Sequence, residues 1–173
     1  NFLGFPGTIG KPDHYAIVDP VTVPLCKRDE FSERLAYFPG CYQPNNYRVL
    51  EDGKFNLRDA SKPFVFCCLN NSYKISEAEI EAWCQILQRC KHSSFILLSD
   101  NQNAQESLTK IFTERFFIDR IKFVPRSSYY KYLKKLSEAD LFLDTFLVNA
   151  HTTAADALRA GTPLLTVFGN KFA

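Results

Sequence analysis

The chain has 173 residues, enough for one domain or one and a half and for a substantial buried core. Hydrophobic residues make up 46% and charged residues 23%, and seven glycines and nine prolines are too few for a low-complexity or collagen-like chain, so the composition indicates a globular protein. Lysine and arginine number 21 against 19 acidic residues, and this near balance excludes the strong field that attracts nucleic acid or anionic lipid.

The first third of the chain consists of short segments that glycine and proline interrupt. Strand-like apolar runs occur at 15–18 and 35–38, and His14 is interpreted as a loop histidine. The stretch 45–62 is polar and rich in turn-forming residues, which is typical of a linker. We therefore expect a domain boundary there.

The start of the chain also bears on its organisation. It contains no Met and begins with Asn1 in an apolar, glycine-rich stretch, so we expect a fragment of a longer protein. In this interpretation residues 1–58 end one domain, 59–62 form the linker, and 63–173 form most of a second domain.

After Pro63 short apolar runs alternate with helical stretches. The expected strands cover 64–69, 95–98, 121–124, 141–143 and 164–167. The expected helices cover 76–89, 103–116, 127–137 and 152–160, and Ser76 with Glu79 forms a capping-box pattern at the first of them. Continuous apolar strands that alternate with helices predict an α/β fold, a Rossmann-like parallel sheet covered on both faces.

Cysteine and histidine usage bears on chemistry and setting. The six cysteines show no C-x-x-C spacing, and adjacent Cys67 and Cys68 would point to opposite faces of a strand, which favours reduced thiols and a cytoplasmic setting over disulfides. No histidine is spaced for metal binding with another His or Cys, so we expect no metal site. The apolar runs are far shorter than the roughly 20 residues that cross a bilayer, so we expect no membrane partner.

Polar residues follow three of the expected strands. In an open parallel sheet the ligand crevice lies outside the carboxyl ends of the strands, where the loops meet at one edge. The polar loops here are 70–74, 125–128, 144–145 and 149–153. We expect the functional site at this edge.

The residues that begin the fourth helix suit an anion. His151, Thr152 and Thr153 would present backbone N–H groups, hydroxyls and the positive end of the helix dipole, which fits a diphosphate. Lys74 could neutralise that diphosphate and assist its departure, and Asp156, in the first turn, would reach ribose hydroxyls. In the purely structural alternative the threonines cap the helix, Asp156 favours its dipole, and Lys74 is a solvated surface lysine.

Several motifs occur in an order that one family shares. They are L-G-F-P-G-T at 3–8, V-D-P at 18–20, C-Y-Q-P-N at 41–45, N-N-S-Y-K-I at 70–75, A-D-L-F-L-D-T at 139–145, N-A-H-T-T at 149–153 and D-A-L-R-A-G-T-P at 156–163. With these motifs, which span nearly the whole chain, it resembles the bacterial-like branch of the O-linked N-acetylglucosamine transferase and SPINDLY family.

The resemblance implies an inverting, metal-independent and cofactor-free glycosyltransferase of the GT-B type. Such an enzyme has two Rossmann-like lobes and transfers a sugar from a nucleotide diphosphate, here most simply UDP-N-acetylglucosamine, to Ser or Thr of an acceptor protein. Residues 1–58 would end the N-terminal lobe, and 63–173 would form most of the nucleotide-binding C-terminal lobe. The general base and tetratricopeptide repeats are expected upstream, so the chain alone is expected to be inactive.

Three alternatives remain. Two are a GDP-fucose-dependent protein O-fucosyltransferase of the same family and a nucleotide-binding module without transfer chemistry. A dinucleotide dehydrogenase is disfavoured because no G-x-G-x-x-G follows the strand at 64–69.

The resemblance also assigns the residues of the site. Lys74 would be catalytic and, with His151, Thr152 and Thr153, would hold the diphosphate; Asp156, Asn71, Ser127 and Tyr132 would bind ribose and base; Leu3, Gly4 and Pro6 would line the sugar pocket. Asn71 stands where the animal enzymes carry Gln. Tyr132 stands where the family has a base-stacking His, so an aromatic face is kept and the choice between UDP and GDP stays open.

Overall fold

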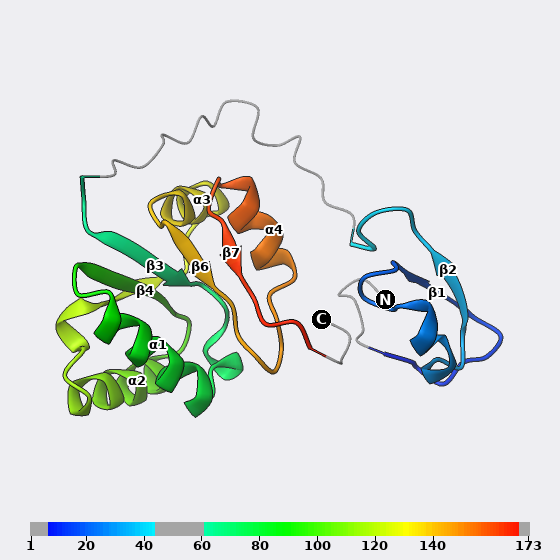
Figure 1. The fold of residues 1–173 in the computed structure, drawn as a ribbon, viewed down its shortest axis with the longest axis horizontal. Coiled ribbons are helices and arrows are strands. Elements are labelled where there is room, and N and C mark those ends of the chain that lie inside the picture. The colour runs from blue at the N-terminus through cyan, green and yellow to red at the C-terminus, as the bar shows by residue number, and fades with distance from the viewer. Residues whose placement is uncertain (1–6, 44–60, 170–173) are drawn as a thin grey trace. The chain divides into compact units, whose positions relative to one another are not determined.

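The computed structural model describes residues 7–43 and 61–169, which fall in two compact units (Figure 1). Of the described residues, 7–43 and 168–169 belong to the first unit and 61–167 to the second. The linker predicted at 59–62 lies partly outside the described residues and stays a prediction.

The first unit contains a two-stranded parallel sheet. Strand β1 (Tyr15–Val18) pairs with β2 (Arg34–Tyr37), and the 3-10 helix η1 (Leu25–Glu30) lies between them in the sequence. Val18 and Val23 are buried. Both strands were predicted, but their parallel pairing was not.

Glu33, directly before β2, ties the start of this unit to the sheet. Its carboxylate accepts hydrogen bonds from the Ile9 N–H (2.9 Å), the Lys11 N–H (3.1 Å) and the Thr8 hydroxyl (2.7 Å). Burial alone would raise the pKa of Glu33, but the bonds from Thr8, Lys11 and Ile9 outweigh it and lower the pKa from 4.5 to about 2. The ionised carboxylate is therefore the form that stabilises the unit.

This lowered pKa predicts the acid response of the first unit. Its stabilisation is fully present above pH 4.5, the unfolded pKa, and is lost as the pH falls toward 2. Amide NMR signals of residues 8–37, followed from pH 7 to pH 2, should shift or vanish over that interval. In Glu33→Gln, which cannot titrate, the same step should be absent; identical profiles would contradict the assignment.

The second unit is built on a five-stranded parallel sheet. Its strands are β3 (Phe64–Cys68), β4 (Ser93–Ser99), β5 (Ile121–Pro125), β6 (Leu141–Leu143) and β7 (Leu164–Leu165), in the order β5-β4-β3-β6-β7. All four pairings are parallel, which confirms the predicted fold class. Strand β7 ends earlier than predicted because it pairs only with the three-residue strand β6.

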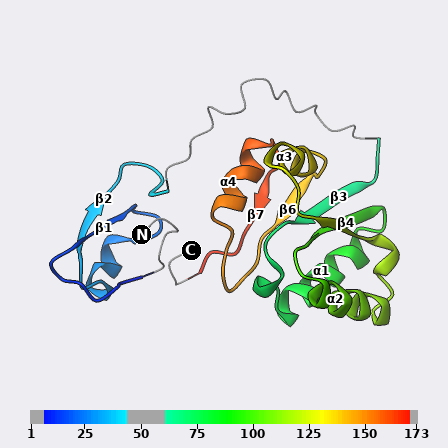
Figure 2. The same ribbon diagram turned by 180° about the vertical axis from the view of Figure 1, so that it is seen from behind.

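Helices cover both faces of this sheet. Helices α1 (Glu77–Arg89) and α2 (Gln102–Glu114) lie on one side, and α3 (Tyr129–Ser137) and α4 (Thr152–Arg159) lie on the other (Figures 1 and 2). Right-handed crossovers produce this arrangement, because the direction of strand addition reverses between β5 and β6. Short 3-10 helices, η3 (Ser72–Lys74) and η4 (Ile118–Arg120), were not predicted.

Helix ends follow local chemistry. The predicted capping box at α1 is present, with the Ser76 N–H donating to Glu79 Oε2 at 2.8 Å. Helix α2 ends before the predicted residue because Phe116 adopts a left-handed conformation (φ 63°) and the Phe117 N–H turns back to the Phe112 carbonyl at 2.8 Å. Helix α3 begins at Tyr129, two residues later than predicted.

The core of the second unit includes buried residues from all four helices, and α1 contributes the largest of them, Trp83. The predicted inward face of α1 is buried and consists of Ile80, Trp83, Cys84 and Leu87. Trp83 meets Phe95 of β4 edge-to-face, with ring centroids 4.8 Å apart and planes at 86°. This packing fixes α1, and with it the turn that precedes α1, against the sheet.

All six cysteines lie in the described ranges and are free thiols; Cys67 and Cys68 of β3 are fully buried. No helix within those ranges has the length and apolarity needed to cross a membrane. The same residues contain no cluster of His, Cys, Asp and Glu able to bind a metal ion.

Candidate functional site

The strand order reverses between β3 and β6, which are neighbours in the sheet. The chain leaves β3 toward β4 and β5 on one side, whereas β6 leads to β7 on the other. Loops that leave in opposite directions open a crevice at the carboxyl ends of the strands. The loop after β3 carries Asn71 and Lys74, and the loop after β6 leads to His151 at the start of α4.

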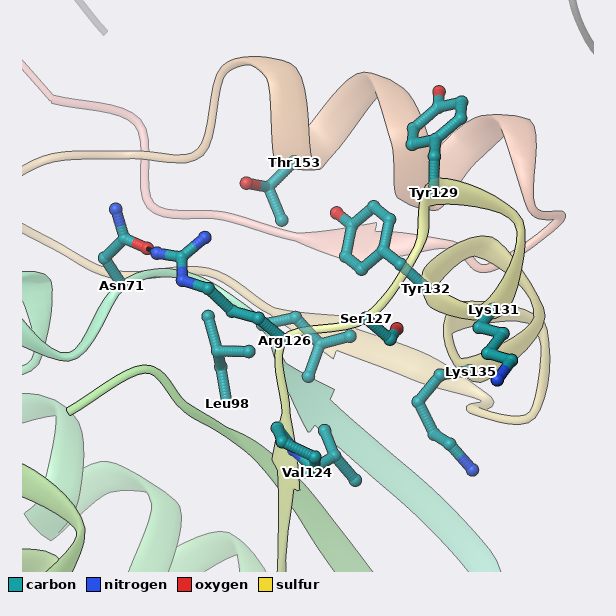
Figure 3. Close-up of a pocket in the computed structure, with 12 residues that line it drawn as sticks. Asn71, Leu98, Val124, Arg126, Ser127, Tyr129, Lys131, Tyr132, Lys135 and Thr153 are labelled. Atoms are coloured by element: carbon teal, nitrogen blue, oxygen red, sulfur yellow. Dashed lines mark hydrogen bonds between the residues drawn. The ribbon is translucent and has the colours of Figure 1, made fainter. Parts of the chain in front are cut away.

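A pocket of about 640 Å³ lies at this edge (Figure 3). Its size suits a small-molecule ligand. The apolar lining consists of Leu69, Leu98, Val124 and Pro125 at the ends of three strands. The polar lining consists of Asn71, Arg126, Ser127, Tyr129, Lys131, Tyr132, Lys135 and Thr153.

Four predicted site residues therefore line one pocket. Asn71 follows β3, Ser127 follows β5, Tyr132 lies on α3, and Thr153 lies in the first turn of α4. These residues come from four separate segments of the chain. The arrangement supplies apolar surface, an aromatic ring and hydrogen-bonding groups, which is the combination that a nucleoside needs.

Two tyrosines, Tyr129 and Tyr132, line the pocket, and Asp156 is bonded to the first of them. The rings of Tyr129 and Tyr132 stack with centroids 6.2 Å apart, and the Tyr129 hydroxyl donates to Asp156 Oδ1 at 2.6 Å. Burial, and then the Asp156 carboxylate, raise the pKa of Tyr132, so this ring stays neutral. Burial likewise raises the pKa of Asp156, although the hydrogen bonds from Tyr129 and Tyr132 oppose it.

The position of Asp156 differs from the expected one. It lies beyond the first turn of α4, and its side chain is buried with one oxygen already bound to a tyrosine. The sequence pattern could not reveal this partner, because Tyr129 lies on α3, which neighbours α4. Ribose binding by Asp156 stays a prediction.

The side chain of Lys74 connects the loop after β3 with the loop between β6 and α4. It ends η3, is half-buried, and its Nζ donates to the Asn149 carbonyl at 3.0 Å. Its ammonium thus lies against the loop that leads into α4. The alternative of a solvated surface lysine does not describe this contact.

The start of α4 carries the other residues predicted for the diphosphate. His151 is the residue before the helix and is half-buried, Thr152 is exposed, and Thr153 lines the pocket. Burial and then the positive charge of Lys74 lower the pKa of His151, whereas the negative charge of Asp144 opposes them. His151 is therefore neutral at pH 7 and can donate or accept a hydrogen bond.

Sequence reasoning missed Arg126 and Tyr129. Arg126 reaches across the pocket, where its Nη2 donates to Asn71 Oδ1 at 2.5 Å (Figure 3). The same nitrogen lies 3.9 Å from Asp100 Oδ2, and the Asp100 carboxylate accepts the Ser72 N–H at 3.2 Å. The available signal was the place of Arg126 directly after a strand, in a loop already recognised as polar.

Three predicted residues have no structural description. Leu3, Gly4 and Pro6, assigned to a sugar pocket, lie outside the described residues. Their role stays a prediction.

Comparison with known proteins adds independent information. Residues 43–173 match the model of Glycosyl transferase family 41. The chain is 32% identical to the probable UDP-N-acetylglucosamine–peptide N-acetylglucosaminyltransferase SEC of Arabidopsis thaliana, over 96% of the chain and 18% of that protein. It is 27% identical to a probable SPINDLY transferase of Eustoma exaltatum subsp. russellianum, over 97% of the chain and 19% of that protein.

Solved structures share the fold. A mutant of the Thermobaculum terrenum O-GlcNAc transferase matches with a TM-score of 0.83 at 21% identity, over 96% of this chain and 32% of that one. The pneumococcal O-GlcNAc transferase GtfA, in complex with UDP and GlcNAc, matches with a TM-score of 0.58 at 15% identity, over 88% and 29%. The chain spans about a fifth of the length of the two curated relatives described above.

Proposed function

The chain belongs to glycosyl transferase family 41, and we propose that it forms the nucleotide-binding part of an inverting protein O-glycosyltransferase. The proposed donor is UDP-N-acetylglucosamine, and the acceptor is a Ser or Thr hydroxyl of a protein. The proposal rests on one observation. Asn71, Ser127, Tyr132 and Thr153 line the same pocket, at the switch point of the sheet. The names of the relatives support the choice of donor.

In the proposed reaction, the acceptor oxygen forms a bond to the anomeric carbon of the sugar. The bond from that carbon to the diphosphate breaks, and the hydroxyl proton leaves to a base. Negative charge then develops on the departing diphosphate. The Lys74 ammonium and the N–H groups at the start of α4 would stabilise this charge, so the chain supplies the role that a metal ion plays elsewhere.

The nucleoside would occupy the pocket proper. Tyr132 offers a ring face on which the base can stack, while Ser127 and Asn71 offer hydrogen-bonding groups. Tyr132 replaces the base-stacking His expected from the family resemblance, so uracil and guanine must be compared directly. The free cysteines support a reducing, cytoplasmic setting, and tetratricopeptide repeats would recruit the acceptor.

Calorimetric titration of the full-length protein with UDP and GDP, together with a transfer assay on an acceptor protein, tests the proposal. UDP binding and N-acetylglucosamine transfer are expected. Preference for GDP would identify the fucosyltransferase alternative. Nucleotide binding without transfer would identify a binding module, and the absence of both would overturn the proposed function.

The start of α4 gives a more specific prediction. His151→Ala and Thr152→Ala should each weaken UDP binding about tenfold and change uridine binding less than about twofold, because these residues address the phosphates. Asp156→Ala should weaken uridine and UDP alike. The control is Thr113→Ala, an exposed threonine on α2. Equal losses of uridine affinity and UDP affinity in His151→Ala would show that His151 does not bind the diphosphate.

A further inference from the structure

Asp144 directly follows β6, and its carboxylate is buried, with the residue only 4% exposed. A buried carboxylate is stable only when hydrogen-bond donors surround it. Both oxygens meet this condition. Oδ1 accepts from Asn70 Nδ2 (3.1 Å), the Thr145 N–H (2.8 Å) and the Ala150 N–H (2.8 Å), and Oδ2 accepts from Asn149 Nδ2 (3.2 Å) and the Thr166 hydroxyl (2.8 Å).

These donors come from three strand ends. Asn70 follows β3, Thr166 follows β7, and the other three belong to the loop between β6 and α4. One carboxylate therefore joins the segments that meet at the switch point. Five hydrogen bonds to one charged group leave the loop little freedom to take another conformation.

The same loop leads to His151 and contacts Lys74, two of the residues proposed to bind the diphosphate. Ala150, whose N–H bonds to Asp144, directly precedes His151. Asn149, whose side chain bonds to Asp144, offers its carbonyl to Lys74 Nζ at 3.0 Å. Asp144 is thus linked to His151 through its hydrogen bond to the preceding residue, Ala150, and to Lys74 through Asn149.

We infer that Asp144 is a positioning residue for sugar transfer, which acts through Ala150 and Asn149 to hold His151 and Lys74 around the diphosphate. The inference rests on the proposed function. The five donors to Asp144 described above are protein groups, so the proposed effect of Asp144 on the sugar donor is indirect.

The test is Asp144→Asn in the full-length protein. The two side chains have nearly the same shape, but an amide has only one acceptor oxygen. Its NH₂ group would take the place of one carboxylate oxygen and would face the N–H or O–H donors that now bond to that oxygen. The loop must then shift. We expect kcat to fall at least about tenfold and UDP affinity to fall more than uridine affinity, because only the diphosphate groups move.

Asp140→Asn is a matched control. Asp140 lies at the opposite end of β6, where its Oδ2 accepts the Val65 N–H at 2.6 Å, far along the strand from the crevice. This variant should lower the thermal midpoint while kcat and UDP affinity stay within about twofold of wild type. Comparable loss of kcat in both variants would show that Asp144 contributes only to stability.

A double-mutant cycle with Lys74→Ala separates positioning from general damage. If Asp144 acts through Lys74, the loss of UDP affinity caused by Asp144→Asn should shrink when Lys74 is already alanine. Fully multiplicative losses with both Lys74→Ala and His151→Ala, or an unchanged kcat in Asp144→Asn, would overturn the inference. A wild-type protein that neither binds UDP nor transfers sugar would instead overturn the proposed function.

Discussion

Replacing Lys74 with alanine is expected to lower kcat on the order of a hundredfold, which corresponds to about 3 kcal/mol of transition-state stabilisation. Negative charge grows on the diphosphate as the sugar leaves, and the Lys74 ammonium lies at the junction of the two loops that would receive it. The loss should appear mainly in kcat, because the interaction strengthens as the bond breaks. Steady-state kinetics of transfer in the full-length protein measure it.

Two variants make the Lys74 result interpretable. Lys110→Ala removes an exposed lysine from α2, whose Nζ lies 4.0 Å from Glu114 Oε1, and should leave kcat unchanged. Lys74→Arg keeps the charge with a different shape and should recover part of the activity. Wild-type turnover in Lys74→Ala would show that Lys74 is an ordinary surface lysine with no role in transfer.

The largest loss of stability is expected from Trp83→Ala, about 3–5 kcal/mol, because the vacated volume lies in a packed core. Trp83 is 1% exposed, and Phe95, its edge-to-face partner, is fully buried. Urea unfolding followed by circular dichroism should show a lower midpoint without a change in slope.

Trp83→Phe is the matched variant for this position. It keeps a ring against Phe95 and leaves a smaller cavity, so its loss of stability should be clearly smaller than that of Trp83→Ala. Equal midpoints for Trp83→Ala and wild type would contradict the packing described here. A selective loss of nucleotide binding in Trp83→Ala would show that α1 positions the turn at Ser72–Lys74.

The sequence predicted the elements of the second unit well because each has a strong local signal. Continuous apolar runs identified the strands, and the capping box with its apolar stripe identified α1. The short 3-10 helices and the left-handed Phe116 were missed, since a bulky aromatic residue rarely adopts that conformation and carries no signal for it.

Contacts between distant segments could not be predicted in the same way. The loops of the site were recognised because parallel strands bring their carboxyl ends together, and Lys74 and Thr153 do lie at that edge. The bond between Tyr129 and Asp156 depends on how α3 packs beside α4, and the bond between Arg126 and Asn71 on how two loops face each other. No periodicity in a single sequence encodes either geometry.

The strand order also has a consequence for the order of folding. Strands β3, β4 and β5 pair with their neighbours along the chain, whereas β6 must return to β3, and the contact between Asn70 and Asp144 joins residues 74 positions apart. Contacts over such separations carry a larger loop-closure entropy and form later than local ones. A chain that has formed only β3–β5 therefore has an unpaired β3 edge and no diphosphate crevice. A nucleotide can stabilise only the completed sheet, so its binding free energy acts on the last step of folding.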